Sequence, residues 1–93
     1  EPVHLERYPA VRLAYDVINQ GGTAGTGFNA ANEVVVKAFL EQSLPFGSMI
    51  AIVEEVLGSI SISDHVSIDS VVEADKEARL QASALVASHK VNY

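Results

Sequence analysis

One glycine pattern in the sequence has the spacing of a dinucleotide-binding loop. Residues 25–30 read Gly-Thr-Gly-Phe-Asn-Ala, which matches the G-x-G-x-x-A fingerprint. That loop works because a strand delivers the pyrophosphate to a helix N-terminus. Here the preceding segment has a helical pattern, and no acidic residue follows about 20 positions on to hold a ribose. We favour a glycine-rich connector between helices, with a small nucleotide-binding protein that uses the Gly25 loop as the alternative.

The segment over residues 29–33 is the most unusual local feature. Two amides and a carboxylate, from Asn29, Asn32 and Glu33, flank two alanines. Amides and free backbone N–H groups at a helix start could bind an anion. Capping explains the same residue types, because Asn29 can accept a hydrogen bond from the first helical turn and Glu33 can pair with Lys37 at i+4. We expect the capping role, with Asn32 one turn on and the alanines allowing another helix to approach closely.

The other polar residues form no recognisable catalytic or metal-binding set. His4, His65 and His89 are scattered, and no pair of them has the spacing of a metal site. Asp75 and Arg79 lie one helical turn apart, and we expect a structural ion pair there rather than a solvated face or a metal ligand. The sequence therefore predicts no catalytic, cofactor-binding or metal-binding residue in this chain. The structural candidates are Asn29, Asn32, Glu33, Asp75 and Arg79.

Composition narrows the class of protein further. The chain has 93 residues, enough for one domain or part of one. Its 6 basic and 12 acidic residues give a net charge of −6, which argues against a nucleic-acid or anionic membrane surface. There is no cysteine, so disulfides and thiolate chemistry are excluded. No apolar run approaches the roughly 20 residues that span a bilayer.

Four segments with apolar residues at helical spacing predict an all-α fold. Tyr8-Pro9 opens the first, Asn29 caps the second, Gly47 or Ser48 caps the third, and Ser67 caps the fourth, which reaches about Ser88. Glycines end the first helix at residues 21–22 and the third near residue 58. Residues 59–66 alternate serine and isoleucine over much of their length, and we interpret them as an extended connector, since no second strand is available. We expect an antiparallel four-helix bundle over residues 8–90, after a linker at 1–7.

The first two helices carry more specific expectations. On the first, Leu13, Ala14, Val17 and Ile18 belong to one apolar stripe, and Arg12 can pair with Asp16 on the opposite side. On the second, Val36 and Leu40 add apolar surface beside the stripe. We therefore expect the second helix to be central and covered on two sides.

The order of short motifs along the chain resembles the C-terminal part of the 1-deoxy-D-xylulose 5-phosphate reductoisomerase family. The motifs are Arg7-Tyr8-Pro9, Leu13-Ala14-Tyr15, Gly21-Gly22-Thr23, Asn29-Ala30-Ala31-Asn32-Glu33-Val34, Ala38-Phe39-Leu40, Pro45-Phe46 and Asp75-x-x-Ala78-Arg79. The chain departs from the family pattern at Gly25, Phe28 and Gly47.

The resemblance implies a support role within a larger enzyme. Full-length members convert 1-deoxy-D-xylulose 5-phosphate to 2-C-methyl-D-erythritol 4-phosphate with NADPH and a divalent metal, Mn or Mg, in non-mevalonate isoprenoid biosynthesis. The groups that bind the cofactor, the metal and the substrate would lie in earlier domains. We therefore expect this piece alone to be inactive and to bind neither NADPH nor the metal. The implied partners are the catalytic domain of its own chain and a second copy in a homodimer, in the bacterial cytoplasm or a plastid. A free-standing acidic protein-interaction module is the alternative.

Overall fold

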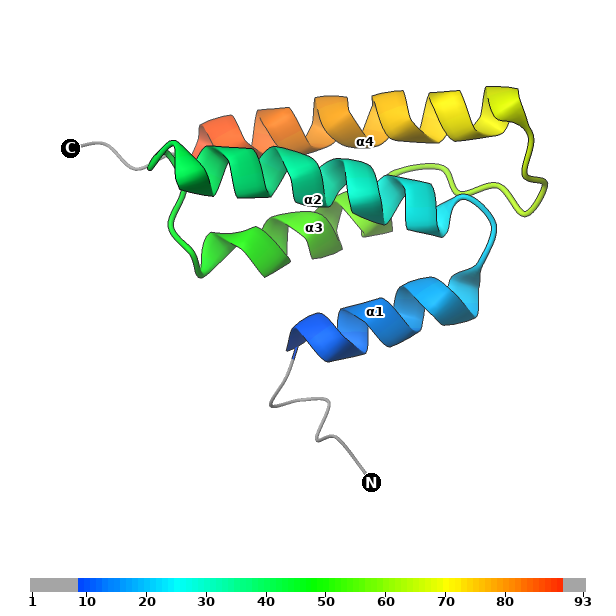
Figure 1. Cartoon of the computed structure of the whole chain (residues 1–93), viewed down its shortest axis with the longest axis horizontal. Coiled ribbons are helices and arrows are strands. Elements are labelled where there is room, and N and C mark those ends of the chain that lie inside the picture. Colours follow the sequence, from blue (N-terminus) through cyan, green and yellow to red (C-terminus); the bar gives the residue numbers. More distant parts are fainter. Residues whose placement is uncertain (1–8, 90–93) are drawn as a thin grey trace.

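The computed structural model describes residues 9–89 and places them in four helices (Figure 1). These are α1 (Pro9–Gln20), α2 (Ala24–Leu40), α3 (Ser48–Ser59) and α4 (Ile68–His89). Successive helices run in opposite directions, and residues 9–89 contain no strand. The predicted all-α antiparallel bundle is confirmed. The described residues exclude 1–8 and 90–93, and with them His4 and Tyr8. The predicted linker at 1–7 and the predicted domain limits therefore stay predictions.

The core lies where α2, α3 and α4 meet. Its buried residues are Ala30, Ala31, Val35 and Ala38 of α2, Ile52, Val53 and Val56 of α3, and Ala74, Ala78 and Ala82 of α4. Alanine at every fourth position of α4 makes a ridge of small side chains, which lets α2 and α4 approach closely. α2 contacts all three other helices, so its predicted central place is confirmed. Its flank is less covered than expected, because the Leu40 side chain is 72% exposed.

The predicted start of α2 is wrong. The helix begins at Ala24 with Thr23 as its N-cap residue, so Asn29 lies inside the helix and caps nothing. Glycines at 25 and 27 favour a connector, since glycine costs about 1 kcal/mol in a helix interior. Gly27 is nevertheless buried, and a Cβ there would lie 2.5 Å from Cδ1 of Ile60. The close packing of Ile60 against Gly27 therefore outweighs the low helix propensity of the two glycines.

The connection between α1 and α2 needs two residues in the left-handed region. Gly21 has φ +67° and Gly22 has φ +56°, and the Gly21 N–H donates to the Val17 carbonyl at 3.1 Å. A Cβ on Gly22 would overlap the carbonyl oxygen of Ser63. The predicted glycine stop of α1 is confirmed, and Gly22 has the further task of letting the α3–α4 connector approach.

The α3–α4 connector spans residues 60–67, one residue later at each end than the predicted 59–66, and forms no strand, as predicted. At its end the Ser67 hydroxyl accepts a hydrogen bond from the Ser70 N–H at 3.0 Å, and the Ser70 hydroxyl accepts one from the Ser67 N–H at 2.8 Å. This reciprocal pair is a capping box with serine in the usual glutamate position. Ser67 therefore caps the N-terminus of α4, as predicted. The cap of α3 is Gly47, one of the two residues expected.

The side chains of α1 are arranged differently from the prediction. Arg12 pairs with Glu54 of α3, with 2.6 Å between Nη2 and Oε2, rather than with Asp16. Leu13 is buried, but Ala14 and Ile18 of the same predicted stripe are exposed. The stripe was expected to face the bundle, and half of it faces outward.

Candidate functional site

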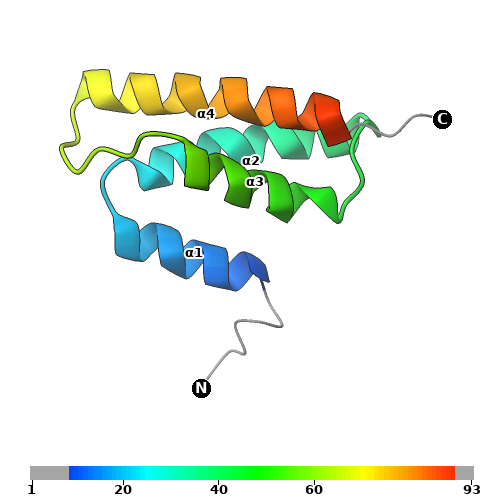
Figure 2. The ribbon, with the colours of Figure 1, turned by 180° about the vertical axis from the view of Figure 1, so that it is seen from behind.

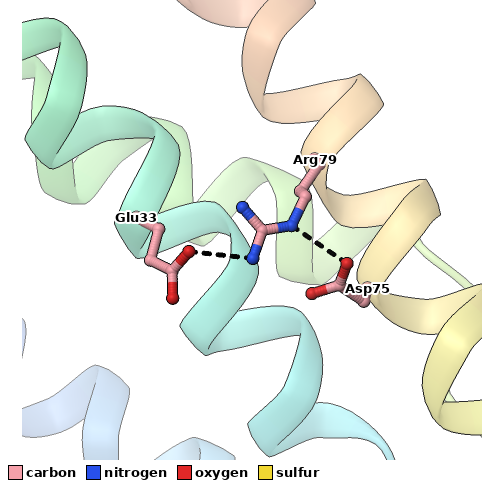
Figure 3. A network of polar contacts seen from close by, with 3 residues as sticks. All are labelled: Glu33, Asp75 and Arg79. Carbon is pink, nitrogen blue, oxygen red and sulfur yellow. Dashed lines mark hydrogen bonds and ion pairs between the residues drawn. The ribbon is translucent and has the colours of Figure 1, made fainter.

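The most connected polar group among the predicted structural residues is the Arg79 network (Figure 3). Arg79 of α4 donates from Nε to Oδ2 of Asp75 at 2.9 Å and from Nη2 to Oε1 of Glu33 on α2 at 2.8 Å. The Asp75–Arg79 pair has the predicted i,i+4 geometry. The predicted partner of Glu33 is wrong, because Glu33 pairs with Arg79 instead of Lys37. One guanidinium thus ties α2 to α4.

The electrostatics of this network suit a structural role. The hydrogen bonds that Arg79 donates to the carboxylates of Asp75, the larger cause, and Glu33 raise the pKa of Arg79 above its ordinary value. The guanidinium therefore stays charged and cannot exchange protons as an acid or base would. The side chains of Arg79 and Asp75 are both 42% exposed, and ion pairs with this exposure contribute little to stability. Of the two pairs, Arg79–Glu33 joins α2 to α4, whereas Arg79–Asp75 lies within α4.

The two predicted amides are not part of the network. Asn29 and Asn32 lie in α2 and are exposed. The backbone N–H groups that begin α2 lie at residues 24–27, so the expected Asn29 cap does not form, and the alternative anion site would lack free N–H groups at residue 29. Of the five structural candidates, the structure brings together Glu33, Asp75 and Arg79.

A second polar group, which was not predicted from the sequence, links distant segments. Thr23 is 1% exposed. Its N–H donates to the Ser63 carbonyl at 2.9 Å, and its hydroxyl accepts from the Ser63 N–H, also at 2.9 Å. The Ser61 N–H donates to the Glu77 carboxylate at 3.1 Å. The connector is therefore fixed to α2 on one side and to α4 on the other.

A shallow groove lies between this connector and α4. It has a volume of about 520 Å³ and is lined by Thr23, Ser61, Ser63, Ser70, Glu73, Ala74, Lys76, Glu77 and Leu80. The Thr23, Ser63 and Ser70 hydroxyls in it already bond to backbone groups. Such hydroxyls position the chain and are not paired with a general base.

The glycine pattern does not fit a dinucleotide. Gly25 and Gly27 lie inside α2, and α1 rather than a strand precedes them. The Gly27 N–H donates to the Thr23 carbonyl at 3.1 Å, and Gly27 is buried beside Ile60. A pyrophosphate cannot approach this backbone as it does in a strand–loop–helix site.

A metal site does not fit either. Within the residues that the structure describes, no three His, Cys, Asp or Glu side chains are grouped so that they could hold a metal ion. In the same range, no helix is both long and apolar enough to cross a bilayer.

Comparisons with known proteins agree with one another. A family model described as the DXP reductoisomerase C-terminal domain matches residues 1–81. Proteins named 1-deoxy-D-xylulose 5-phosphate reductoisomerase are 42% identical over 88 residues in Ralstonia pickettii and 45% identical over 82 residues in Rhodospirillum centenum. These matches cover 95% and 88% of this chain, but 22% and 20% of the relatives.

A solved structure gives the same result. The reductoisomerase from Zymomonas mobilis in complex with NADPH superposes with a TM-score of 0.83 and 40% identity, over 95% of this chain and 23% of that one. The chain thus spans less than a quarter of the length of these proteins.

Proposed function

The chain belongs to the DXP reductoisomerase C-terminal domain family, and from that premise we propose that it is the helical support domain of a full-length reductoisomerase. The observation that carries the proposal is the match of residues 1–81 to this family. The superposition on the Zymomonas mobilis enzyme, at 40% identity, supports it.

We propose that the full-length polypeptide converts 1-deoxy-D-xylulose 5-phosphate to 2-C-methyl-D-erythritol 4-phosphate, with NADPH as reductant and Mn or Mg as the metal. The names of the relatives support the activity, and the NADPH complex of the neighbour supports the cofactor. Within residues 9–89 the side chains fit neither group. The chemistry would therefore belong to other parts of the polypeptide.

The support role follows from how rigidly the elements are joined. Close-packed cores transmit small displacements rather than absorb them, and the core here is built on buried alanines of α2 and α4. Arg79 and the Thr23–Ser63 pair add contacts between segments 46 and 40 residues apart. A catalytic site misplaced by about 1 Å loses roughly a hundredfold in rate. A rigid neighbouring domain can thus affect turnover without contacting substrate.

Assays of the purified chain test the support role. We expect the 93-residue chain to show no turnover with substrate, NADPH and Mn²⁺, and no heat of NADPH binding by calorimetry. Turnover by this chain alone would contradict a purely supporting function. NADPH binding would instead favour the Gly25 loop as a nucleotide site.

The alternative, a free-standing acidic interaction module, is not favoured by the family match. The coding sequence discriminates between the two, since an upstream reading frame for a dinucleotide-binding domain is expected only of the enzyme. We further propose a homodimer of the full-length enzyme, which light scattering tests. For the compartment we propose the bacterial cytoplasm or a plastid. The absence of cysteine suits such a reducing compartment, and cell fractionation tests it.

A further inference from the structure

The first helix has apolar surface for two partners. At 100° per residue, Leu13, Val17, Ala14, Ile18 and Tyr15 follow one another around α1 over about 200°. A helix that packs on one side needs an apolar stripe only somewhat wider than about 100°. Leu13 is 4% exposed and Val17 is partly buried, whereas Ala14 is exposed, Tyr15 is 50% exposed and Ile18 is 73% exposed. We call Ala14, Tyr15 and Ile18 the outer face of α1.

The packing of α1 on α2 and α3 covers only part of the apolar surface of α1. α1 lies at one side of the three-helix core (Figure 2), and it contacts α2 and α3. Leu13 is the one fully buried side chain among residues 12–20. The Arg12–Glu54 pair is about half exposed, at 43% and 42%, and adds little. A helix of 12 residues is marginal without tertiary contacts.

We propose that the outer face of α1 docks against the part of the same polypeptide that precedes the family domain. The docking surface there is apolar, with a polar group for the Tyr15 hydroxyl. This inference rests on the proposed function. The family is described as a C-terminal domain, and the matched relatives are more than four times as long as their matched parts. The remaining length of a relative therefore lies mainly before this domain and reaches it at its first helix.

One other exposed apolar residue, Leu80, is placed less well for this partner. Leu80 of α4 is 67% exposed, but α4 and α1 lie on opposite sides of the bundle in both views (Figures 1 and 2). Leu80 therefore resembles Ile18 in exposure and differs from it in position. It serves as the matched control.

Hydrogen exchange in the full-length enzyme tests the proposal. Wild-type α1 amides should be protected, and Ile18→Gln should speed their exchange by about tenfold or more, because a buried isoleucine is lost. Leu80→Gln should change the exchange of α1 less than about twofold. Unprotected α1 amides in the wild type would overturn the proposal, as would equal effects of the two substitutions or an unchanged exchange rate in Ile18→Gln.

Two further measurements keep the result interpretable. If Ile18→Gln does not accumulate as folded protein, Tyr15→Phe and Ile18→Ala replace it, and at least one of them must speed α1 exchange for the proposal to stand. Light scattering follows the mass, and a variant that speeds exchange while halving the mass would overturn the proposal in favour of a second copy on this face. Wild-type turnover is measured separately, so that an inactive enzyme with a protected α1 contradicts the proposed function alone.

Discussion

Three glycines form a substitution series in which the structure predicts a different outcome for each alanine. Gly25 lies in α2 with ordinary helical φ, and nothing lies within 4 Å of an added Cβ. Gly21 has φ +67° and open space. Gly22 has φ +56° and would place its Cβ on the Ser63 carbonyl oxygen. The series therefore separates helix propensity, backbone strain and close packing.

The free energies of unfolding follow from these three environments. Gly25→Ala should stabilise the chain by about 0.5–1 kcal/mol through helix propensity. Gly21→Ala should destabilise it by about 1–2 kcal/mol, the cost of a left-handed residue with a Cβ. Gly22→Ala adds to that strain the disturbance of the two Thr23–Ser63 hydrogen bonds, for a total of about 2–4 kcal/mol.

Urea unfolding of the 93-residue chain, followed by circular dichroism, measures all three values. On the thermal scale the Gly22→Ala loss corresponds to about 10–25 °C in Tm. If Gly22→Ala and Gly21→Ala were equally stable, the close approach of the connector to Gly22 would be wrong. If Gly25→Ala were destabilising, the helical state of residues 24–27 would be wrong.

Four other substitutions test three separate parts of the fold. Gln42 follows α2 with φ +62°, and the N–H groups of Gln42 and Ser43 donate to carbonyls in the last turn of α2. Because glycine adopts this left-handed conformation without strain, Gln42→Gly should raise the free energy of unfolding, measured in urea, by about 0.5–1 kcal/mol. Val35 is fully buried and Val36 is not; Val35→Ala should cost about 2 kcal/mol and Val36→Ala less than about 1 kcal/mol by the same measurement. Arg79→Met should lower the urea midpoint of unfolding slightly at low salt and not at all in 1 M NaCl, since the ion pairs of Arg79 are exposed. A large, salt-independent loss of stability would mean that the aliphatic part of the Arg79 side chain packs more tightly than the structure indicates.

Periodic elements of the fold could be predicted from the sequence because their cause is local. The spacing of apolar residues predicted all four helices, and Gly21 and Ser67 marked helix ends that the structure confirms. The i,i+4 geometry of Asp75 and Arg79 is likewise fixed by one helix.

Features that depend on distant segments could not be predicted. The start of α2 was missed because Gly27 is explained by Ile60, 33 residues later, and not by its neighbours. The Thr23–Ser63 bonds and the Glu33–Arg79 pair join residues 40 and 46 positions apart. A single sequence gives no distance between such segments, so a local partner, Lys37, was preferred for Glu33. The outward half of α1 was misassigned for a related reason, since the width of an apolar stripe does not say how many partners cover it.

The central claim is that this helical domain supports a catalytic site that it does not itself contain. The most direct test is the turnover of 1-deoxy-D-xylulose 5-phosphate and NADPH by the full-length polypeptide, compared with the same polypeptide lacking this domain. We expect the full-length protein to be active and the shortened one to lose at least about a hundredfold in kcat/KM, the penalty of a site displaced by about 1 Å. A shortened polypeptide with undiminished kcat/KM would contradict the account.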